Sequence, residues 1–537
     1  MDEGSVSTAE DGLTRNIGFF GLLLTSEGSI IGSGWLFGAL VAATIGGPAA
    51  IIAWLIGSLA VILLALVHAE LGGMFPVSGG TTRFPYYAFG GLAGASFGWF
   101  SWLQAVGTAP IEVEAAITYT SNYWHGLTRT VGGVPVLTGT GYVVAMVLMA
   151  LFVVINLFGV RFLVRANSAI TTWKVIIPTL TILVLFFTHF DTSNFTSHGF
   201  APFGAHGVLR AVSDGGAVFA LVGFEQAVQL GGESKNPQRD MPRAVIFSML
   251  LGATIYILLQ VVFIGALPHQ ALAHGWANIS FAGIFGPFAG LAKGLGLAWL
   301  AYILYADAII APVGSGLIYT TTTSRITFGM SKNGHVPSIF EKTTKKSNVP
   351  VFGLIFAFLM GLLLFLPFPG WQKLVGFITS ATVLMYAGAP LALGALRLQK
   401  PDAQRPYRLP WAGVLAPLSF ISASFIIYWS GWGVVWKLMV AVVLGYVLMA
   451  ISRITNANPV HSPMDWNSAI WLWPYLGMMT LISYLGQFQG GRNWIPFGWD
   501  LVVVAAWSLI VYYTAIRLRL PEEKVDEYTM GVFAFES

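Results

Sequence analysis

The sequence predicts an all-α, polytopic membrane protein, and three observations lead to that fold class. Hydrophobic residues make up 56% of the 537 residues and charged residues only 9%, whereas soluble globular chains carry about 25% charged residues. Apolar stretches of about 20 residues, the length of a bilayer-spanning helix, recur along the whole chain. Gly, Trp and Phe are abundant, as in packed membrane helices with aromatic belts.

About fourteen stretches are long and apolar enough to be predicted as transmembrane helices. The third and eighth are longer than a bilayer requires, and Pro474 dilutes the thirteenth. In chain order the stretches lie near 17–44, 48–74, 84–122, 141–160, 166–188, 208–232, 244–267, 288–323, 350–368, 372–397, 411–430, 433–452, 467–488 and 498–518.

The predicted helices group as five, five and four. Residues 17–188 form the first five-helix repeat, 208–397 the second, and 411–518 the four accessory helices. Residues 1–16 and 519–537 are predicted tails. The first tail lacks the basic region of a cleaved signal peptide, so the first hydrophobic segment is expected to stay in the mature protein.

The basic residues predict the orientation in the membrane. Most of the 27 Lys and Arg residues fall in loops that face the cytoplasm when the N-terminus is placed inside. Cytoplasmic loops carry this excess of positive charge. We therefore expect an inner or plasma membrane protein whose N- and C-termini are both cytoplasmic.

Several function classes are excluded or disfavoured. The chain has no cysteine, so disulfides, thiol chemistry and cysteine zinc sites are excluded. A net charge of +4 spread among loops gives no nucleic-acid footprint. The spacing of His189, His198 and His206 fits no compact metal motif. No P-loop, HExxH or nucleophile elbow is present, so we expect no enzyme, no metal and no cofactor.

Glycine and serine interrupt the first apolar segment. The run Gly28-Ser29-Ile30-Ile31-Gly32-Ser33-Gly34 contains three glycines and two serines. One interpretation is close helix packing, since Gly28 and Gly32 have the GxxxG spacing. The other is an unwound segment: its free amides and the N-terminus of the following half-helix would attract an anion. Carbonyls before the break would attract a cation, so a zwitterion suits the pair.

The sixth segment is interrupted in the matching position of the second repeat. Its breaks are Gly215-Gly216 and Gly223-Phe224-Glu225. Paired discontinuous helices in corresponding positions of two repeats indicate the binding site of a transporter. The second break therefore favours the unwound-segment interpretation of the first.

Ordered motifs give the chain a family resemblance over roughly residues 17–400. It resembles permeases of the amino acid–polyamine–organocation (APC) superfamily, which have a LeuT-like fold of two inverted five-helix repeats. Within that superfamily it is most similar to bacterial proton-coupled amino-acid permeases. The motifs are Ile31-Gly32-Ser33-Gly34, Ala69-Glu70-Leu71-Gly72, Pro76-Val77-Ser78-Gly79-Gly80, Gly223-Phe224-Glu225, Glu233-Ser234-Lys235-Asn236-Pro237, Pro242-Arg243-Ala244 and Ser324-Arg325.

The resemblance implies where a substrate binds. The amides of Ser33 and Gly34 would bind the carboxylate of an amino acid. The carbonyls of Ile30, Phe219 and Val222 would receive its α-amino group. The resemblance also makes Phe219 an aromatic gate over the substrate.

Lys174 lies within the fifth apolar segment. A lysine at membrane depth is costly and usually faces the protein interior. It either snorkels to the cytoplasmic interface or replaces a sodium ion, as a lysine of this segment does in proton-coupled relatives. In the second case, losing and regaining a proton would couple transport to protons.

Several acids lie within apolar segments. Glu225 sits at the break in segment six and resembles a coupling or gating residue, with a purely structural contact as the alternative. Glu27 precedes the first break and either favours a cationic partner or marks the approach to the cavity. Asp307 is a candidate for the proton path. Glu112 and Glu114 are two residues apart, so they cannot both face one cavity on a helix.

These patterns predict a secondary active transporter that imports amino acids by proton symport. The coupling ion is a proton, and the partners are an amino-acid substrate and the lipid bilayer, with no nucleic acid. A carrier or exchanger of polyamines, other amines or potassium ions is the alternative. Backbone contacts are shared among amino acids, so they select no substrate side chain, and no pattern specifies an oligomeric state.

Overall fold

The structure is a computed structural model, and it is helical almost throughout. The predicted tail 1–16 lies outside the described residues, as does the last part of the predicted tail 519–537. Motif residue Ser78 is outside them too. The structure describes residues 17–77, 79–131, 134–158, 160–344, 349–366, 370–460 and 462–530.

The first predicted repeat begins with a broken helix. Gly79 and Gly90 turn the chain at the two ends of α4, with φ values of +75° and +85°, so the predicted third segment, 84–122, is corrected to two helices, α4 and α5. The elements are α1 (Phe19–Ile30), α2 (Gly34–Gly46), α3 (Ala50–Met74), α4 (Gly80–Phe89), α5 (Gly91–Thr120), α6 (Gly139–Leu157) and α7 (Val160–Thr188).

The second predicted repeat begins with a more finely divided helix. The predicted eighth segment, 288–323, is corrected to two helices, because Gly296 turns the chain with a φ of +78° before α13. The elements are α8 (Gly204–Ser213), α9 (Ala217–Ala220), α10 (Glu225–Gln229), α11 (Pro237–Ala266), α12 (Pro287–Gly294), α13 (Ala298–Lys332), α14 (Val351–Leu364), α15 (Trp371–Tyr386) and α16 (Gly388–Gln399).

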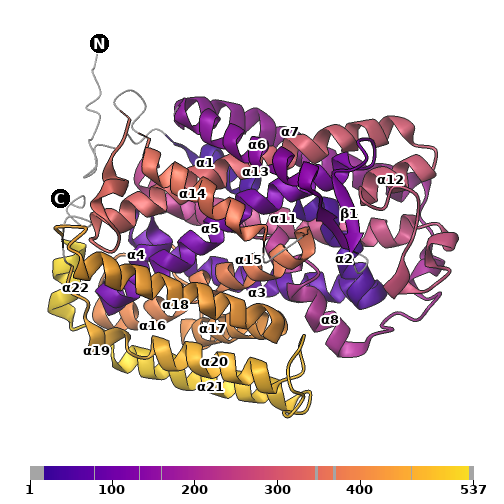
Figure 1. Ribbon diagram of the computed structural model, residues 1–537. Coiled ribbons are helices and arrows are strands. Elements are labelled where there is room, and N and C mark those ends of the chain that lie inside the picture. Colours follow the sequence, from indigo (N-terminus) through magenta and orange to yellow (C-terminus); the bar gives the residue numbers. More distant parts are fainter. Residues whose placement is uncertain are drawn as a thin grey trace.

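The C-terminal region forms a separate layer of helices on this body. In Figure 1 the orange and yellow helices of this region lie below the helices of the first predicted repeat. The predicted thirteenth segment is divided into α19 and α20. The elements are α17 (Ala412–Trp429), α18 (Trp432–Ile454), α19 (Trp466–Ala469), α20 (Leu472–Leu485), α21 (Trp499–Arg517) and α22 (Glu522–Thr529).

A short hairpin departs from the all-α prediction. Strands β1 (Thr128–Val131) and β2 (Val134–Leu137) pair antiparallel between α5 and α6. Their residues are largely β-branched, which suits a strand. The hairpin leaves the membrane-spanning architecture unchanged.

Nine helical segments within the described part of the chain are long and apolar enough to cross a membrane. The segment Gly34–Met74 joins two predicted spans, and Phe19–Ile30 and Val351–Leu364 are shorter apolar helices. The chain is therefore a polytopic helical membrane protein, while the exact count of about fourteen spans stays a prediction.

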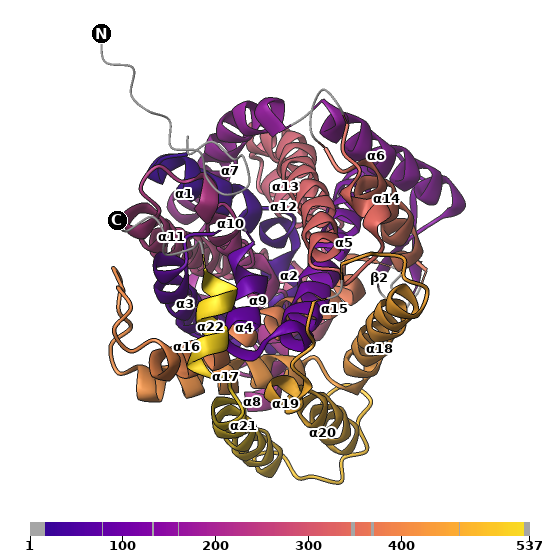
Figure 2. The same ribbon diagram turned by 90° about the vertical axis from the view of Figure 1, so that its left-hand side faces the viewer.

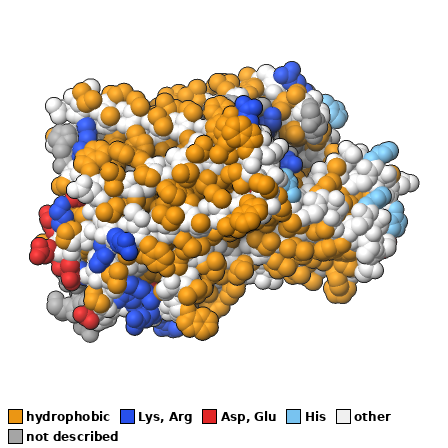
Figure 3. Space-filling model, turned by 90° about the horizontal axis from the view of Figure 1, so that it is seen from below, with side chains coloured by type: hydrophobic (Ala, Val, Ile, Leu, Met, Phe, Trp, Pro, Cys, Tyr) orange, Lys and Arg blue, Asp and Glu red, His pale blue; other side chains and the backbone are white. Residues whose placement is uncertain are grey.

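The surface agrees with a bilayer setting. Figure 3 shows hydrophobic side chains over the middle of the molecule and the visible Asp and Glu at one end, together with many Lys and Arg. The described chain ends lie at that same end (Figures 1 and 2). The first break lies inside the bundle, since α1 packs on α7 and α11 and Ile30, Ile31 and Ser33 are buried.

Candidate functional site

The first half of the candidate site is the gap between α1 and α2. α1 ends at Ile30 and α2 begins at Gly34. The last α-helical hydrogen bond before the gap runs from the Ile31 amide to the Glu27 carbonyl, at 2.9 Å. Ser33 is the N-cap of α2, and its side chain makes no capping hydrogen bond. The gap therefore exposes backbone groups to neighbouring side chains rather than to the helix.

The second half is the segment between α9 and α10. Gly216 precedes α9 with a φ of +84°, and Gly223 lies in the following gap with a φ of +146°. A Cβ built on Gly223 would lie 2.6 Å from the backbone nitrogen of Ile30. Only glycine allows this approach together with that backbone conformation. The two predicted breaks therefore touch each other.

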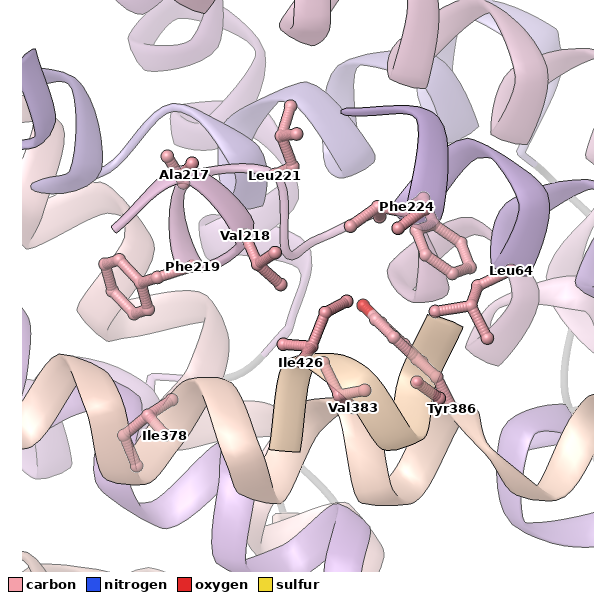
Figure 4. Close-up of a cluster of buried hydrophobic side chains, with 14 of the residues drawn as sticks. Leu64, Ala217, Val218, Phe219, Leu221, Phe224, Ile378, Val383, Tyr386 and Ile426 are labelled. Atoms are coloured by element: carbon pink, nitrogen blue, oxygen red, sulfur yellow. The ribbon is translucent and has the colours of Figure 1, made fainter. Parts of the chain in front are cut away.

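The predicted substrate-binding residues of the two halves are close neighbours. A Cβ built on Gly34 would lie 2.8 Å from the Cα of Ala220, so the start of α2 packs on the end of α9. Phe219 and Val222 are both buried, and the Val222 amide donates to the Phe219 carbonyl at 3.1 Å. Figure 4 shows Phe219 and Phe224 at opposite ends of this broken segment.

Ser33 is held by two side chains from elsewhere in the fold. Its backbone amide donates to Oε2 of Glu112 on α5, at 2.8 Å. Its hydroxyl accepts a hydrogen bond from the indole of Trp371, the first residue of α15, at 2.9 Å. A carboxylate of the protein thus occupies an amide for which the resemblance implies a substrate carboxylate.

Ile30 is held in a similar way. The Tyr256 hydroxyl of α11 donates to the Ile30 carbonyl at 2.8 Å. Above the gap, the rings of Phe219 and Trp371 meet edge to face, with centroids 5.9 Å apart at 87°. In this conformation, groups of the protein itself therefore engage an amide and a carbonyl of the predicted site.

Lys174 is completely buried, so the alternative in which it snorkels to the interface is wrong. Its ammonium donates to the Gly28 carbonyl at 2.6 Å and to the Ser315 hydroxyl at 2.9 Å. Charge interactions also link it to Glu112 and Asp307. A cation therefore braces the end of α1 against α13 directly beside the first break.

Glu225 begins α10 and is completely buried. Tyr319 donates to one carboxylate oxygen at 3.0 Å and Tyr386 donates to the other. Figure 4 shows the Tyr386 hydroxyl directed toward the broken segment. The contacts join α10 to α13 and α15, so the carboxylate both holds the broken helix and links it to its neighbours.

The two remaining acids differ in their surroundings. Asp307 accepts hydrogen bonds from the indoles of Trp35 and Trp173, at 3.1 and 2.7 Å. Glu27 is buried, and neither carboxylate oxygen has a hydrogen-bond partner among the described residues. An unpaired buried carboxylate is costly unless it is protonated or meets a cation.

Several side chains of this site were not among the predicted site residues, and Glu112, Tyr256 and Trp371 are those that bind Ser33 or Ile30. An acid within an apolar helix is itself a functional signal, so Glu112 was detectable as a candidate. Its direction was not, because Glu114 two residues later instead accepts the Gly370 amide at 3.0 Å. Tyr256 and Trp371 lie in ordinary aromatic-rich helices and carry no sequence signal.

The described residues contain no group of three or more His, Cys, Asp or Glu side chains that could hold a metal ion. Asp191, after α7, pairs with His269, after α11, at 3.1 Å. The buried charges of the site instead surround backbone groups at two helix breaks.

Discontinuous helices that meet inside a membrane bundle, with buried charges beside the breaks, are the arrangement of secondary transporters. The family described as amino acid permease matches residues 17–449. The chain belongs to this family, a branch of the APC superfamily. It is therefore a multi-pass plasma membrane transporter and not an enzyme.

Two bacterial relatives align along nearly the whole chain. The glutamate/serine transporter AimA of Bacillus subtilis is 40% identical over 510 residues, which are 94% of each protein. The aspartate-proton symporter of the same organism is 37% identical over 95% of this chain and 98% of its own. Human cationic amino acid transporter 4 is 28% identical over 78% of this chain and 65% of its own.

Proposed function

We propose that the chain imports amino acids by proton symport and binds the substrate backbone where α1–α2 and α9–α10 are broken. The observation that carries the proposal is the contact of the two breaks, in which Gly223 packs on Ile30. Backbone amides and carbonyls at the two helix breaks then lie side by side, which suits a zwitterion. The family membership and the two Bacillus subtilis relatives support the same function.

In the proposed complex, the amides of Ser33 and Gly34 bind the substrate carboxylate. The carbonyls of Ile30, Phe219 and Val222 bind its α-amino group, and Phe219 covers it. The substrate carboxylate must displace Glu112 from the Ser33 amide, and the α-amino group must displace Tyr256 from the Ile30 carbonyl.

Proton coupling is assigned to the buried charges around the breaks. Lys174 occupies the position of a sodium ion between Gly28 and Ser315. When the substrate carboxylate displaces Glu112, the charge balance around Lys174 changes, and a proton is taken up. Asp307 and Glu27 supply the proton path, and Glu225 transmits the change to α10.

The side chain of the substrate is proposed from the relatives. The two relatives at 37–40% identity are named for glutamate, serine and aspartate. We propose a small polar or acidic amino acid for this chain. A carrier of polyamines, other amines or potassium ions is the second candidate, which the unpaired carboxylate of Glu27 favours.

The proposed transport mechanism also requires a membrane topology. Residues 17–188 and 208–397 form two inverted repeats, residues 411–518 add four helices, and the total is about fourteen spans. Both termini face the cytoplasm. Rocking of one part of the bundle against the other would expose the midplane site to each side in turn.

Uptake into proteoliposomes tests the proposal. Glutamate, aspartate, serine, lysine and putrescine are offered at two external pH values, with and without an inward proton gradient. We expect gradient-driven uptake of glutamate, aspartate or serine, and no uptake of putrescine. Uptake of putrescine alone, or uptake that is indifferent to the proton gradient, would refute it.

Lys174→Ala tests the coupling role in the same assay, with Lys437→Ala on α18 as the matched control. In Lys174→Ala the proposed coupling charge is lost, so gradient-driven uptake should fall at least about tenfold, which corresponds to about 1.4 kcal/mol. Exchange of substrate in counterflow should remain. The control should behave as the wild type. If Lys174→Ala transports normally and stays pH-dependent, the coupling role is wrong.

A further inference from the structure

A cavity of about 260 Å³ lies away from the broken helices. It is bounded by the start of α5, the end of α13, α14 and the second half of α18. In Figure 2, α14 and α18 lie on the outer side of α5. The cavity therefore separates the transport core from an accessory helix.

The wall of the cavity is almost wholly apolar and rigid. Trp99 and Trp102 stack with centroids 4.7 Å apart, and Trp102 stacks on Phe356 at 5.1 Å. Leu448 and Ile451 on α18 also line it and are 46% and 51% exposed. Because exposed apolar residues of such a helix face lipid, the mouth opens toward the bilayer.

The size of the cavity demands an occupant larger than water. An apolar cavity of about 150 Å³ stays dry and accepts benzene. This cavity is larger and adjoins hydrocarbon, and empty space would forfeit the dispersion contacts of its walls. A flexible hydrocarbon chain restores those contacts.

Most polar groups that line the cavity are already satisfied. The Ser96 and Tyr446 hydroxyls are hydrogen-bonded to each other at 2.9 Å. The Trp99 indole donates to the Ala441 carbonyl at 2.9 Å, and Trp102 donates to a threonine hydroxyl at 3.0 Å. These groups therefore have no need of a ligand.

Unsatisfied polar groups gather at one end of the cavity. His335 is 1% exposed, and neither ring nitrogen has a hydrogen-bond partner among the described residues; the Ser452 hydroxyl has none either. Arg453 follows Ser452 and lies beside the lining rather than in it: its Nη2 donates to the Ser462 carbonyl, and its buried Nε has no partner among the described residues. Burial, with the nearby Arg453 charge, lowers the pKa of His335 to about 4, so its neutral ring offers one donor and one acceptor.

This polar end lies where a lipid headgroup would be. His335 follows the end of α13, and Ser452 and Arg453 lie in the last turn of α18. Both helix ends lie toward the end of the molecule at which Figure 3 shows the acidic and many basic side chains. Basic pockets between membrane helices bind anionic lipid headgroups.

We propose that this cavity binds one acyl chain of an anionic phospholipid. The chain lies between Trp99 and Phe356, and the ester and phosphate oxygens accept hydrogen bonds from His335, Ser452 and Arg453. The lipid fills the seam between α18 and the transport core, so it stabilises the attachment of the accessory layer. The site requires both parts of the ligand, because the wall is apolar and its far end holds unpaired donors.

Lipid retention tests the site in purified, delipidated protein. Dioleoylphosphatidylglycerol is added back and bound lipid is counted by native mass spectrometry. Ala95→Phe places a ring in the cavity, whereas Val443→Phe adds the same ring on the exposed face of α18. We expect the lipid-bound fraction of Ala95→Phe to be at least threefold lower than that of the wild type. The lipid-bound fraction of the control should equal that of the wild type. Equal retention by both variants would overturn the proposal.

A second measurement does not depend on the fold of Ala95→Phe. The chain contains no cysteine, so Ser452→Cys carries the only thiol. In delipidated protein, N-ethylmaleimide should label it, and dioleoylphosphatidylglycerol should slow labelling at least fivefold. Deacylated glycerophosphoglycerol should not slow the labelling. Unchanged labelling with lipid, or equal protection by the deacylated compound, would exclude an acyl-chain site.

Discussion

The two broken helices of this permease are stabilised by different chemistry. At the first break, charged and polar side chains from four other helices contact the backbone, as Glu112 does at Ser33 and Lys174 does at Gly28. At the second break, the backbone is shaped by glycine, and its one acid, Glu225, is held by tyrosine hydroxyls.

The difference suggests a division of labour. Around the first break, a lysine and two carboxylates interact electrostatically, so a change of protonation alters the forces on α1. Around the second break, hydroxyl donors surround a single carboxylate, so that segment depends on shape and hydrogen bonding. We therefore expect coupling to protons to respond to changes at the first break, and stability to respond to changes at the second.

The largest effect is expected from Gly223→Ala. The new Cβ would meet the Ile30 nitrogen at 2.6 Å on a backbone that favours glycine. Strain of this kind costs about 1–3 kcal/mol, and the clash adds to it, so uptake should fall about 100-fold or more. Gly413→Ala is the control, because nothing lies within 4 Å of its Cβ. Normal uptake by Gly223→Ala would show that the breaks need not touch.

Tyr386→Phe should have the next largest effect. It removes one of the hydroxyl donors of the Glu225 carboxylate, and hydrogen bonds to charged groups contribute about 1.5–3 kcal/mol. We expect a lower thermal unfolding temperature with little change in the pH profile of uptake. Tyr513→Phe, at an exposed position, is the control. A shifted pH profile with unchanged stability would reverse the roles assigned to the two breaks.

Glu112→Gln should have a moderate effect: substrate affinity should rise, whereas the preceding variants lose uptake or stability. A neutral acceptor binds the Ser33 amide about 1 kcal/mol less tightly than a carboxylate does, so a substrate carboxylate should displace it more easily. Binding should tighten about fivefold by calorimetry, while gradient-driven uptake falls. Glu114→Gln, whose partner is the Gly370 amide, is the matched control. Weaker binding in Glu112→Gln would mean that Glu112 does not compete with the substrate.

The smallest effect is expected from Trp371→Phe. The ring over Phe219 is kept, but the hydrogen bond to the Ser33 hydroxyl is lost. A neutral hydrogen bond contributes about 0.5–1.5 kcal/mol, and near the lower end of that range KM should change about threefold with kcat nearly constant. A loss of kcat alone would instead place Trp371 in the conformational step.

Short sequence patterns predicted many residues of the candidate site. The glycines at the two breaks and the intramembrane Lys174 stand out in an apolar chain, because glycine and charge are costly in membrane helices unless they serve a purpose. The division of the eighth segment was missed, since apolar residues continue through the turn at Gly296. The partners Tyr256 and Trp371 were missed because aromatic residues are common in every helix.

The sequence by itself determined that this protein is a helical membrane protein, where its first and sixth apolar segments are interrupted, and which family it resembles. Those features depend on composition and on short runs of residues. Only the tertiary structure decided that Gly223 lies on Ile30, that Glu112 rather than Glu114 reaches Ser33, and that Lys174 lies between Gly28 and Ser315. The hydrogen bonds among these contacts join residues 79 to 146 positions apart, and their partners are set by how the helices pack rather than by any local pattern.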